Sequence, residues 1–419
     1  MKYGLIGEKL GHSYSKLIQE RLIDNYEYEL HPLSKDALAT FMKEKNFTGI
    51  NVTIPYKQEV IPYLDEIDDK AKSIGAVNTI VNENGKLKGY NTDYHGFKYM
   101  LTFHHIQIKD KKVMVLGNGG ASKAIQAVIQ DLDCKELILV SRTSNEGSVS
   151  YEDAIKLYQD ANIIINTTPL GMYPNNDTQA IDLKPFPKLE ACLDVVYNPL
   201  QTKLILQAKA LGIKAIGGLE MLVAQAKYAL EYFKNIIIEE SEIDRIYREI
   251  LLETSNLVFI GMPGSGKTTI AHKCAEYLDR TCIDLDQEIV KEIGMSIREY
   301  FEIHEEEKFR EVESEICKKY ASLGGLVISC GGGIVKRETN ISALHQNGVL
   351  LQLHRNQKYL ETDASRPLSS NQKDLEKLIR ERTPLYENAR DIYLENDASI
   401  AKVSKKAKEA YINKILNYK

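Results

Sequence analysis

The stretch Gly261-Met-Pro-Gly-Ser-Gly-Lys-Thr268 decides the fold of the second half of the chain. It follows the apolar run 257–260 and precedes the helical pattern 268–278, which is the strand, loop and helix context of a phosphate-binding loop. Backbone N–H groups converge on phosphates at such a helix start, while Lys267 reaches the β and γ oxygens and the Thr268 hydroxyl binds Mg²⁺. The sequence therefore predicts a Mg²⁺-ATP site made of Gly264, Ser265, Gly266, Lys267, Thr268 and Thr269.

Short apolar runs alternate with amphipathic stretches on both sides of this loop, which is the pattern of parallel sheets covered by helices. The expected strands are 112–116, 137–140, 163–165 and 192–196, then 257–260, 326–329 and 349–353. Residues 236–255 show helical spacing of their apolar side chains, which indicates a final helix of the first unit and a very short linker. Two α/β units are predicted.

Length and composition agree with this division. A chain of 419 residues is too long for one ordinary core. The 54 Lys and Arg against 59 Asp and Glu leave a net charge of -5, so no whole-chain attraction to nucleic acid or anionic membrane is expected. Six scattered cysteines indicate reduced thiols, and no signal peptide or membrane-spanning run is found. We expect a cytoplasmic protein that acts on small molecules.

Two acidic residues, Asp284 and Asp286, end an apolar run. In an extended segment both carboxylates would face one side, where one could hold Mg²⁺ through water and the other could accept the proton of a substrate hydroxyl. A solvated strand end would look the same. Further on, Glu307, Arg310 and Glu313 share one helical face, and by itself such a row more often forms surface ion pairs.

Further motifs follow in a fixed order: Ser329-Cys-Gly-Gly-Gly333, Arg366-Pro-Leu and Arg382-Thr-Pro-Leu-Tyr386. Consecutive glycines after a buried strand are costly unless a ligand or another segment approaches closely. With the phosphate loop, D-L-D and F-R-x-x-E, this order resembles shikimate kinase from about residue 257 to the C-terminus.

The kinase resemblance implies a role for each matching residue. Asp286 and Gly332 would contact the ring hydroxyls of shikimate, with Asp286 and Lys267 as catalytic groups. Arg310 and Arg382 would bind the shikimate carboxylate, which suits the bidentate guanidinium. Arg366 would lie on a lid over ATP, and Asp284 would assist Mg²⁺ through water beside Thr268.

The first half contains the turn Gly117-Asn-Gly-Gly-Ala-Ser122 after the predicted strand 112–116, and it approximates the dinucleotide-binding pattern G-x-G-x-x-G. The next strand ends at Ser141-Arg142-Thr143, where an NAD site would usually place an acidic residue against the ribose hydroxyls. A cation there favours the 2′-phosphate of NADP. The predicted NADP residues are Gly117, Asn118, Gly119, Gly120, Ala121, Ser141, Arg142, Thr143, Val195 and Gly218.

Polar motifs upstream and downstream of this turn occur in a recognisable order. They include 11–15, 49–57, 74–79, 91–93, 166–172, 194–199 and 217–225, and together they resemble shikimate dehydrogenase over about residues 1–252. The resemblance makes Lys57 and Asp93 the catalytic pair, in which lysine serves the carbonyl oxygen and the carboxylate positions lysine. It places the substrate against Ser13, Ser15, Thr53, Lys57, Asn78, Asp93, Tyr197 and Gln225.

The expected architecture is α/β throughout. Residues 1–93 with 217–252 would form an α/β substrate lobe, 94–216 a Rossmann NADP-binding lobe, and 253–419 a P-loop NTPase-type kinase domain. The resemblances imply NADPH-dependent reduction of 3-dehydroshikimate followed by Mg²⁺-ATP-dependent phosphorylation of shikimate. Two alternatives remain open at this point: a quinate/shikimate dehydrogenase that uses NAD, and a metabolite-sensing regulator without turnover.

Overall fold

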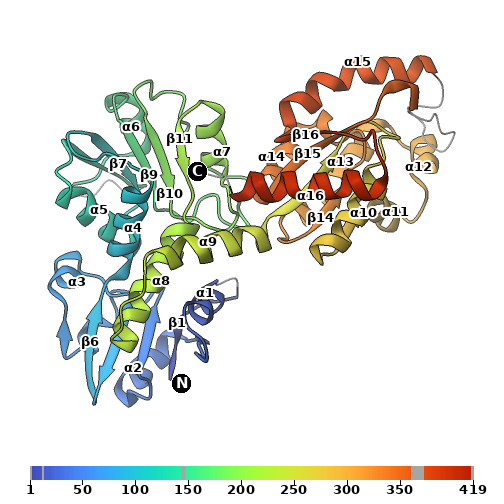
Figure 1. Ribbon diagram of the computed structural model, residues 1–419. Helices are drawn as coiled ribbons and strands as arrows, with labels where there is room; N and C mark the ends of the chain where they lie inside the picture. Colours follow the sequence, from blue (N-terminus) through green and yellow to red (C-terminus); the bar gives the residue numbers. More distant parts are fainter. Residues whose placement is uncertain (1, 12–13, 143–146, 360–371, 417–419) are drawn as a thin grey trace. The chain divides into compact units, whose positions relative to one another are not determined.

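The computed structural model describes residues 2–11, 14–142, 147–359 and 372–416 (Figure 1). The chain forms two compact units, Met1–Tyr247 and Arg248–Lys419. The division falls inside helix α9 (Ser241–Thr254), slightly before the predicted boundary. The helix predicted for residues 236–255 is therefore shared by both units, and only Ser255 separates it from the next strand, β12.

The first unit begins with a mixed sheet in the order β2-β1-β3-β5-β6-β4. Strands β1, β2 and β3 run parallel, whereas β5 pairs antiparallel with both β3 and β6. The strands are β1 (Tyr3–Gly7), β2 (Glu29–Pro32), β3 (Gly49–Val52), β4 (Glu66–Ile67), β5 (Thr79–Glu83) and β6 (Lys86–Tyr90). The helices of this part are α1 (Ser15–Leu22), α2 (Lys35–Glu44), η1 (Ile61–Tyr63) and α3 (Asp69–Ile74).

A second, fully parallel sheet of the first unit has the order β11-β10-β9-β7-β8. Its strands are β7 (Lys112–Leu116), β8 (Glu136–Val140), β9 (Ile163–Asn166), β10 (Ala191–Asp194) and β11 (Lys214–Ile216). Its helices are α5 (Gly120–Asp131), α6 (Tyr151–Leu157) and α7 (Lys203–Ala210). Strand β10 ends two residues before the predicted end, because Asp194 turns its carboxylate back onto the following backbone at Val196.

Two long helices, α4 (Thr92–Phe103) and α8 (Leu219–Lys234), pack side by side in the first unit (Figure 1). Helix α8 also contacts α1, and α4 contacts α5, so this pair joins the elements around both sheets. Residue Asp93 lies in the first turn of α4, whose N-cap Asn91 accepts a hydrogen bond from the Tyr94 N–H. The start of α4 is therefore held in a fixed position between the two sheets.

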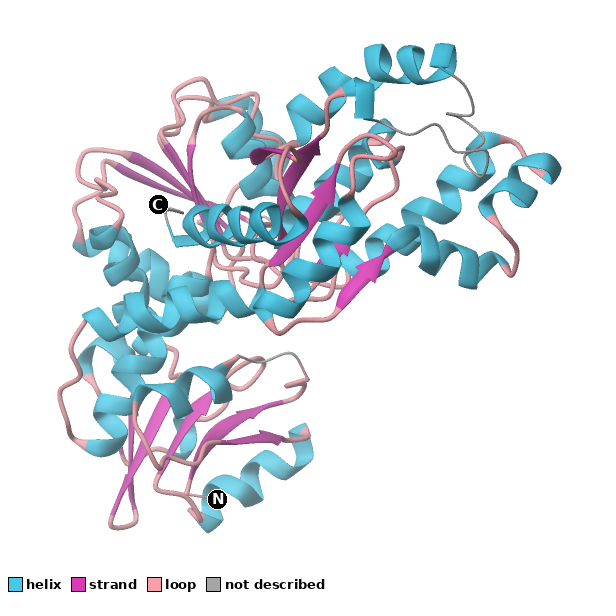
Figure 2. Cartoon of the chain, turned by 45° about the vertical axis from the view of Figure 1, so that its right-hand side comes forward, coloured by secondary structure: helices cyan, strands magenta, loops and turns pink. Residues whose placement is uncertain are grey.

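The second unit contains one parallel sheet in the order β13-β14-β12-β15-β16. Its strands are β12 (Asn256–Ile260), β13 (Cys282–Asp284), β14 (Val327–Ser329), β15 (Gly348–His354) and β16 (Ile392–Glu395). Its helices are α10 (Lys267–Leu278), α11 (Leu285–Ile293), α12 (Ile297–Ile303), α13 (Glu306–Ala321), η2 (Ile334–Lys336), α14 (Glu338–Asn347), η3 (Gln357–Tyr359), α15 (Gln372–Ala389) and α16 (Ile400–Leu416). Figure 2 shows the strands flanked by helices, as the alternating pattern of the sequence predicts.

The cores follow from this arrangement. Strand β7 is buried from Val113 to Leu116, with alternate side chains entering two different apolar clusters, one on each face of its sheet. Strand β12 is buried along its whole length. Parallel strands covered on both faces read as continuous apolar runs, which explains why these two were the easiest to predict. Both carry a glycine-rich loop at their carboxyl ends, so both loops are fixed by a buried strand.

Candidate functional sites

The phosphate loop lies between β12 and α10, as predicted. The Lys267 side chain is buried, and its Nζ donates hydrogen bonds to the carbonyls of Gly261 at 2.8 Å and Met262 at 2.9 Å. The Ser265 hydroxyl is fully buried and has no hydrogen-bond partner among the described residues. A buried cation beside an unpaired hydroxyl donor fits a bound phosphate, whose oxygens would accept from both.

The Thr268 hydroxyl donates to Asp284 Oδ2 at 2.8 Å and lies 3.2 Å from the Ser329 hydroxyl. Oxygen donors of this kind are the ligands that Mg²⁺ prefers. Asp284 ends β13 and is also the N-cap of α11, where it accepts from the N–H groups of Asp286 and Gln287. The prediction that Asp286 lies in an extended segment is therefore wrong: the chain turns into a helix at Leu285 because Asp284 caps it.

Three consecutive glycines after β14 meet three different functional side chains. A Cβ added to Gly331 would lie 2.4 Å from Asp286 Oδ1, and one added to Gly333 would lie 2.2 Å from Arg310 Nη1. Between them, the Gly332 carbonyl accepts a hydrogen bond from Arg382 Nη1 at 2.7 Å. A side chain at position 331 or 333 would therefore force Asp286 or Arg310 to move from its observed position. This glycine turn, Gly331–Gly333, gathers the predicted base and both predicted carboxylate ligands.

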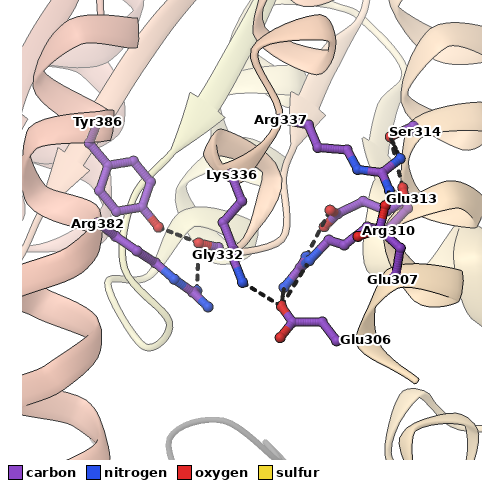
Figure 3. Close-up of polar contacts among 10 residues, drawn as sticks. All are labelled: Glu306, Glu307, Arg310, Glu313, Ser314, Gly332, Lys336, Arg337, Arg382 and Tyr386. Atoms are coloured by element: carbon purple, nitrogen blue, oxygen red, sulfur yellow. Dashed lines mark hydrogen bonds and ion pairs between the residues drawn. The ribbon is translucent and has the colours of Figure 1, made fainter. Parts of the chain in front are cut away.

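The Arg310 guanidinium is held on both of its edges (Figure 3). Arg310 Nη1 donates to the buried Glu313 at 2.7 Å, while its Nε and Nη2 donate to Glu306 Oε1 at 3.2 and 2.9 Å. Lys336 donates to the same Glu306 oxygen at 2.7 Å. Glu307, which shares a helical face with Arg310 in the sequence, pairs instead with Arg337. Two residues that the sequence reading left without a role, Glu306 and Lys336, therefore belong to the Arg310 cluster.

Arg382 approaches from α15. The Tyr386 hydroxyl, one helical turn further on, donates to the Gly332 carbonyl at 2.5 Å and to the Gly261 carbonyl at 3.0 Å. Arg382 Nε is buried without a hydrogen-bond partner among the described residues. An unpaired donor on a buried guanidinium fits an anionic ligand that would accept from it. Tyr386 meanwhile ties the glycine turn to the phosphate loop.

Electrostatics at this site favour proton transfer near neutral pH. Burial and the charges of Asp284 and Glu313 raise the pKa of Asp286 to about 6, although Lys267 and Arg310 act in the opposite direction. A carboxylate with such a pKa is ionised at pH 7 and is a stronger base than an ordinary aspartate. Asp286 is therefore suited to accept the proton of a hydroxyl group.

In the first unit, Lys57 Nζ donates to Asp93 Oδ2 at 2.6 Å. Both side chains are largely buried, with 14% and 10% of their surfaces exposed. The aliphatic stem of Lys57 lies beside Gly120, since a Cβ added there would be 3.3 Å from Lys57 Cδ. Gly120 begins α5 in the dinucleotide turn. The structure therefore brings the predicted catalytic pair to the edge of the predicted cofactor site.

A buried hydrogen-bond network supports the Lys57–Asp93 pair. Asn78 Oδ1 accepts from the Thr92 N–H at 2.7 Å, and the Thr92 hydroxyl lies 3.4 Å from Gln225 Oε1. The Thr92 hydroxyl also contacts the Thr79 hydroxyl, which accepts from Asn51. The predicted site residues Asn78 and Gln225 are thus linked through Thr92, which directly precedes Asp93 in the chain. Sequence analysis did not assign roles to Asn51, Thr79 or Thr92, although all three occur in the quoted motifs.

The remaining predicted substrate residues lie nearby on other elements. Thr53 follows β3, and the preceding Val52 N–H donates to the Asn78 carbonyl at 2.8 Å. Ser15 begins α1, directly after Tyr14, whose ring lies 5.6 Å from that of Tyr197. Burial and the neighbouring Tyr14 raise the pKa of Tyr197 to about 12, so its hydroxyl remains a donor. Ser13 lies outside the described residues.

The dinucleotide turn closes through a serine. The Ser122 hydroxyl donates to the Gly117 carbonyl at 2.6 Å, which explains how serine serves in the third glycine position. The first N–H groups of α5 have no partners within the helix and form an anion site. Further along, a Cβ on Gly218 would lie 2.2 Å from the Val195 carbonyl oxygen, so these two backbone segments touch. Both belong to the predicted NADP residues, and only a glycine at position 218 allows the two segments to approach this closely.

A buried carboxylate that the sequence analysis did not select fixes these loops. Asp194 accepts from the Thr202 hydroxyl at 2.7 Å, Asn166 Nδ2 at 2.9 Å and the Val196 N–H at 3.0 Å. Burial raises the pKa of Asp194 to about 7, although these three hydrogen bonds lower it. The polar residues that end β9 and β10 could have identified this position, because strand ends of parallel sheets meet at one edge.

The predicted 2′-phosphate site lies after β8. Arg142 is exposed there, and the Ser141 hydroxyl lies 3.1 Å from the Ser148 hydroxyl. An exposed guanidinium at the end of the second strand fits a 2′-phosphate and would offer no acceptor to free ribose hydroxyls. Thr143 and Arg366, predicted to contact NADP and ATP, lie outside the described residues.

Each of these two sites indicates a class of enzyme. The first unit is a nucleotide-dependent oxidoreductase with a lysine-aspartate pair, and the second is a P-loop phosphotransferase whose acceptor carries a carboxylate. The chain belongs to the shikimate dehydrogenase family over its first unit and carries a shikimate kinase domain in its second. Residues 5–80 match the shikimate dehydrogenase substrate binding domain, and residues 263–416 match shikimate kinase.

Relatives and solved structures support the first assignment. The chain is 41% identical over 266 residues to a shikimate dehydrogenase (NADP(+)) of Clostridium perfringens, covering 59% of this chain and 97% of that protein. It resembles the structure of a chorismate mutase/shikimate 5-dehydrogenase fusion protein from Clostridium acetobutylicum, with 38% identity, a TM-score of 0.56, and coverage of 59% and 96%. A Thermus thermophilus shikimate 5-dehydrogenase complexed with NADP(H) and shikimate is 28% identical, with a TM-score of 0.54 and coverage of 59% and 99%.

Among the described residues no helix is long and apolar enough to cross a membrane.

Proposed function

We propose that this chain catalyses two consecutive steps of the shikimate pathway: NADPH-dependent reduction of 3-dehydroshikimate to shikimate, and Mg²⁺-ATP-dependent phosphorylation of shikimate to shikimate 3-phosphate. The observation that carries the proposal is the presence of both families in one chain. The alcohol formed by the first site is the acceptor required by the second. Bound NADPH supplies the hydride, and bound Mg²⁺-ATP supplies the phosphoryl group.

In the reductase site, Lys57 and Asp93 act on the oxygen of the substrate carbonyl. The Lys57 ammonium donates a hydrogen bond to this oxygen and gives it a proton as the carbonyl becomes an alcohol. Its 2.6 Å hydrogen bond to Asp93 fixes the position of the ammonium. The amide groups of Asn78 and Gln225, held by Thr92, orient the ring hydroxyls. Ser13, Ser15, Thr53 and Tyr197 complete the predicted substrate set.

In the kinase site, Asp286 accepts the proton of the 3-hydroxyl while Arg310 and Arg382 hold the carboxylate at the other side of the ring. Lys267 places positive charge where the transferred phosphoryl group gains negative charge. Thr268, with Asp284 behind it, would hold Mg²⁺. The backbone of Gly332 contacts a ring hydroxyl, and Arg366 supplies a further cation above the phosphates.

The two activities divide among three lobes. Residues 1–93 with 217–252 form the substrate lobe, because β1–β6 lie within residues 3–90 and α8 packs on α1 and α4. Residues 94–216 form the NADP-binding lobe around the parallel sheet β7–β11. Residues 253–419 form the kinase domain. The proposed substrates are small molecules, and the proposed location of the protein is the cytoplasm.

A coupled assay tests the proposal. The purified chain is given 3-dehydroshikimate, NADPH and Mg²⁺-ATP, and shikimate 3-phosphate is measured by mass spectrometry with NADPH oxidation followed by absorbance. Formation of both products supports the proposal. Preference for quinate and NAD in the reverse direction would instead identify a quinate/shikimate dehydrogenase, and a chain that binds these metabolites without turnover would be a sensor.

A further inference from the structure

The Arg310 guanidinium binds two carboxylates of its own chain through three of its five N–H groups: Nη1 donates to Glu313, while Nε and Nη2 both donate to Glu306. Glu313 is 2% exposed, whereas the Glu306 side chain is 38% exposed. Arg310 therefore has one permanent partner and one partner that can leave toward solvent.

The edge that Glu306 covers is formed by Nε and Nη2, and it lies on the more solvent-exposed side of Arg310, because the Glu306 side chain is 38% exposed and that of Glu313 is 2% exposed. Arg310 lies against Gly333, and Arg382 donates to the neighbouring Gly332, so the two guanidinium groups converge on adjacent residues of the glycine turn. Glu313 binds Nη1 on the buried side of Arg310. A substrate carboxylate that binds Arg310 through both Nε and Nη2 would have to displace Glu306.

Lys336 gives Glu306 a second cation. Its ammonium, 40% exposed, donates to the same Oε1 that accepts from Arg310 (Figure 3). Burial alone would raise the pKa of Glu306, but the hydrogen bonds from Lys336 and Arg310 lower it overall, so the carboxylate is ionised at neutral pH. If Glu306 leaves Arg310, it keeps an ion pair with Lys336 and does not become an unpaired charge.

We propose that Glu306 is an internal stand-in for the substrate carboxylate: it occupies Arg310 in the empty kinase site, and shikimate displaces it onto Lys336. The inference rests on the proposed kinase function. Glu306 then sets the affinity for shikimate without taking part in phosphoryl transfer, and Lys336 lowers the cost of displacement. The two residues determine how strongly the site selects a carboxylate-bearing acceptor.

The substitution Glu306→Gln in the full-length chain tests this proposal, because it removes the competing negative charge and keeps the shape of the side chain. If Glu306 instead only positioned Arg310 for the substrate, the same substitution would raise the KM for shikimate. We expect the KM for shikimate to fall by about two- to fivefold, the scale of a partly exposed ion pair, with kcat and the KM for ATP unchanged. A KM that rises, or stays the same, would overturn the inference. The control is Glu307→Gln in the same helical turn, which pairs with Arg337 and should leave the KM for shikimate unchanged.

A second variant tests the exchange itself. Lys336→Met removes the ammonium that would still pair with Glu306 after shikimate has displaced it from Arg310. The substitution should therefore raise the KM for shikimate in the otherwise wild-type chain and leave it unchanged in the Glu306→Gln variant. An equal increase in both backgrounds would mean that Lys336 contacts the substrate directly, which overturns the exchange. Absence of shikimate-dependent ADP formation by the wild-type chain would reject the proposed kinase function as well, whereas activity without these KM changes rejects this inference alone.

Discussion

The substitution Asp286→Asn should make the kinase unit more stable while it abolishes phosphoryl transfer. Burial and neighbouring carboxylates raise the pKa of Asp286 from 3.8 to about 6 in the folded protein. A carboxyl group with a raised folded pKa favours folding only while it is protonated. Its contribution is complete below the unfolded pKa and is lost as the pH rises through about 6, so ionised Asp286 opposes folding at neutral pH.

The magnitude follows from the two pKa values. A shift from 3.8 to about 6 corresponds to about 3 kcal/mol at pH 7.5 and about half of that at pH 5. The neutral amide of asparagine does not carry this penalty. For a unit of this size we expect the melting temperature to rise by roughly 6–12 °C at pH 7.5. The shikimate-dependent rate should fall by about 10²- to 10⁴-fold because the base is lost.

The assay is scanning calorimetry of the full chain at pH 7.5 and 5, with the kinase transition identified by its shift on adding ADP. A matched control is Asp397→Asn, an exposed aspartate in the same unit that lies outside its helices and strands, which should change neither the melting temperature nor its pH dependence. In the wild type the kinase rate should fall as the pH drops through about 6, since the base becomes protonated. A variant that is equally or less stable at pH 7.5 would refute the reasoning.

Three further perturbations separate the two sites, with the other activity of the same chain as internal control. Lys57→Ala should lower NADPH oxidation by about 10²- to 10⁴-fold and leave ADP formation intact; loss of both would argue against separate sites. Gly333→Ala places a Cβ 2.2 Å from Arg310 Nη1 and should push the guanidinium away from the substrate. Loss of a charged hydrogen bond of ~2 kcal/mol corresponds to an increase of about 30-fold or more in the KM for shikimate in the kinase assay. An unchanged KM would contradict the contact. Arg142→Ala should raise the KM for NADPH by about tenfold with that for NADH unchanged, and equal effects on both would remove its role in cofactor choice.

The elements that could be predicted from the sequence are those marked by a continuous local pattern of apolar residues. The strands before both glycine-rich loops were placed within a residue, because β7 and β12 are buried on both faces and read as apolar runs. The conformation of the segment Asp284–Asp286 was predicted wrongly, because Asp284 caps a helix where the apolar residues before it suggested an extended chain. Local side-chain hydrogen bonding decided that conformation, and spacing alone does not reveal it.

Contacts between distant parts of the chain were the least predictable. Lys336 and Glu306 meet although they are 30 residues apart, and neither belongs to a motif whose chemistry is evident from its spacing. Asp194 likewise joins β9 and β10 through Asn166, which lies 28 residues away. Sequence motifs predicted which side chains would contact ligands, whereas the residues that hold those side chains in place became evident only from the structure.

The glycine turn has a consequence for motion in the kinase site. Asp286, Arg310 and Arg382 come from three different helices, α11, α13 and α15, and each meets one of three successive residues of this turn. A Cβ on Gly332 would lie 2.7 Å from the Pro263 ring, and Tyr386 bonds the carbonyls of both Gly261 and Gly332, so the turn is also held against the phosphate loop. The distance between the acceptor's contacts and the nucleotide is therefore set by the backbone of these two loops, and a shift of either loop would change that distance.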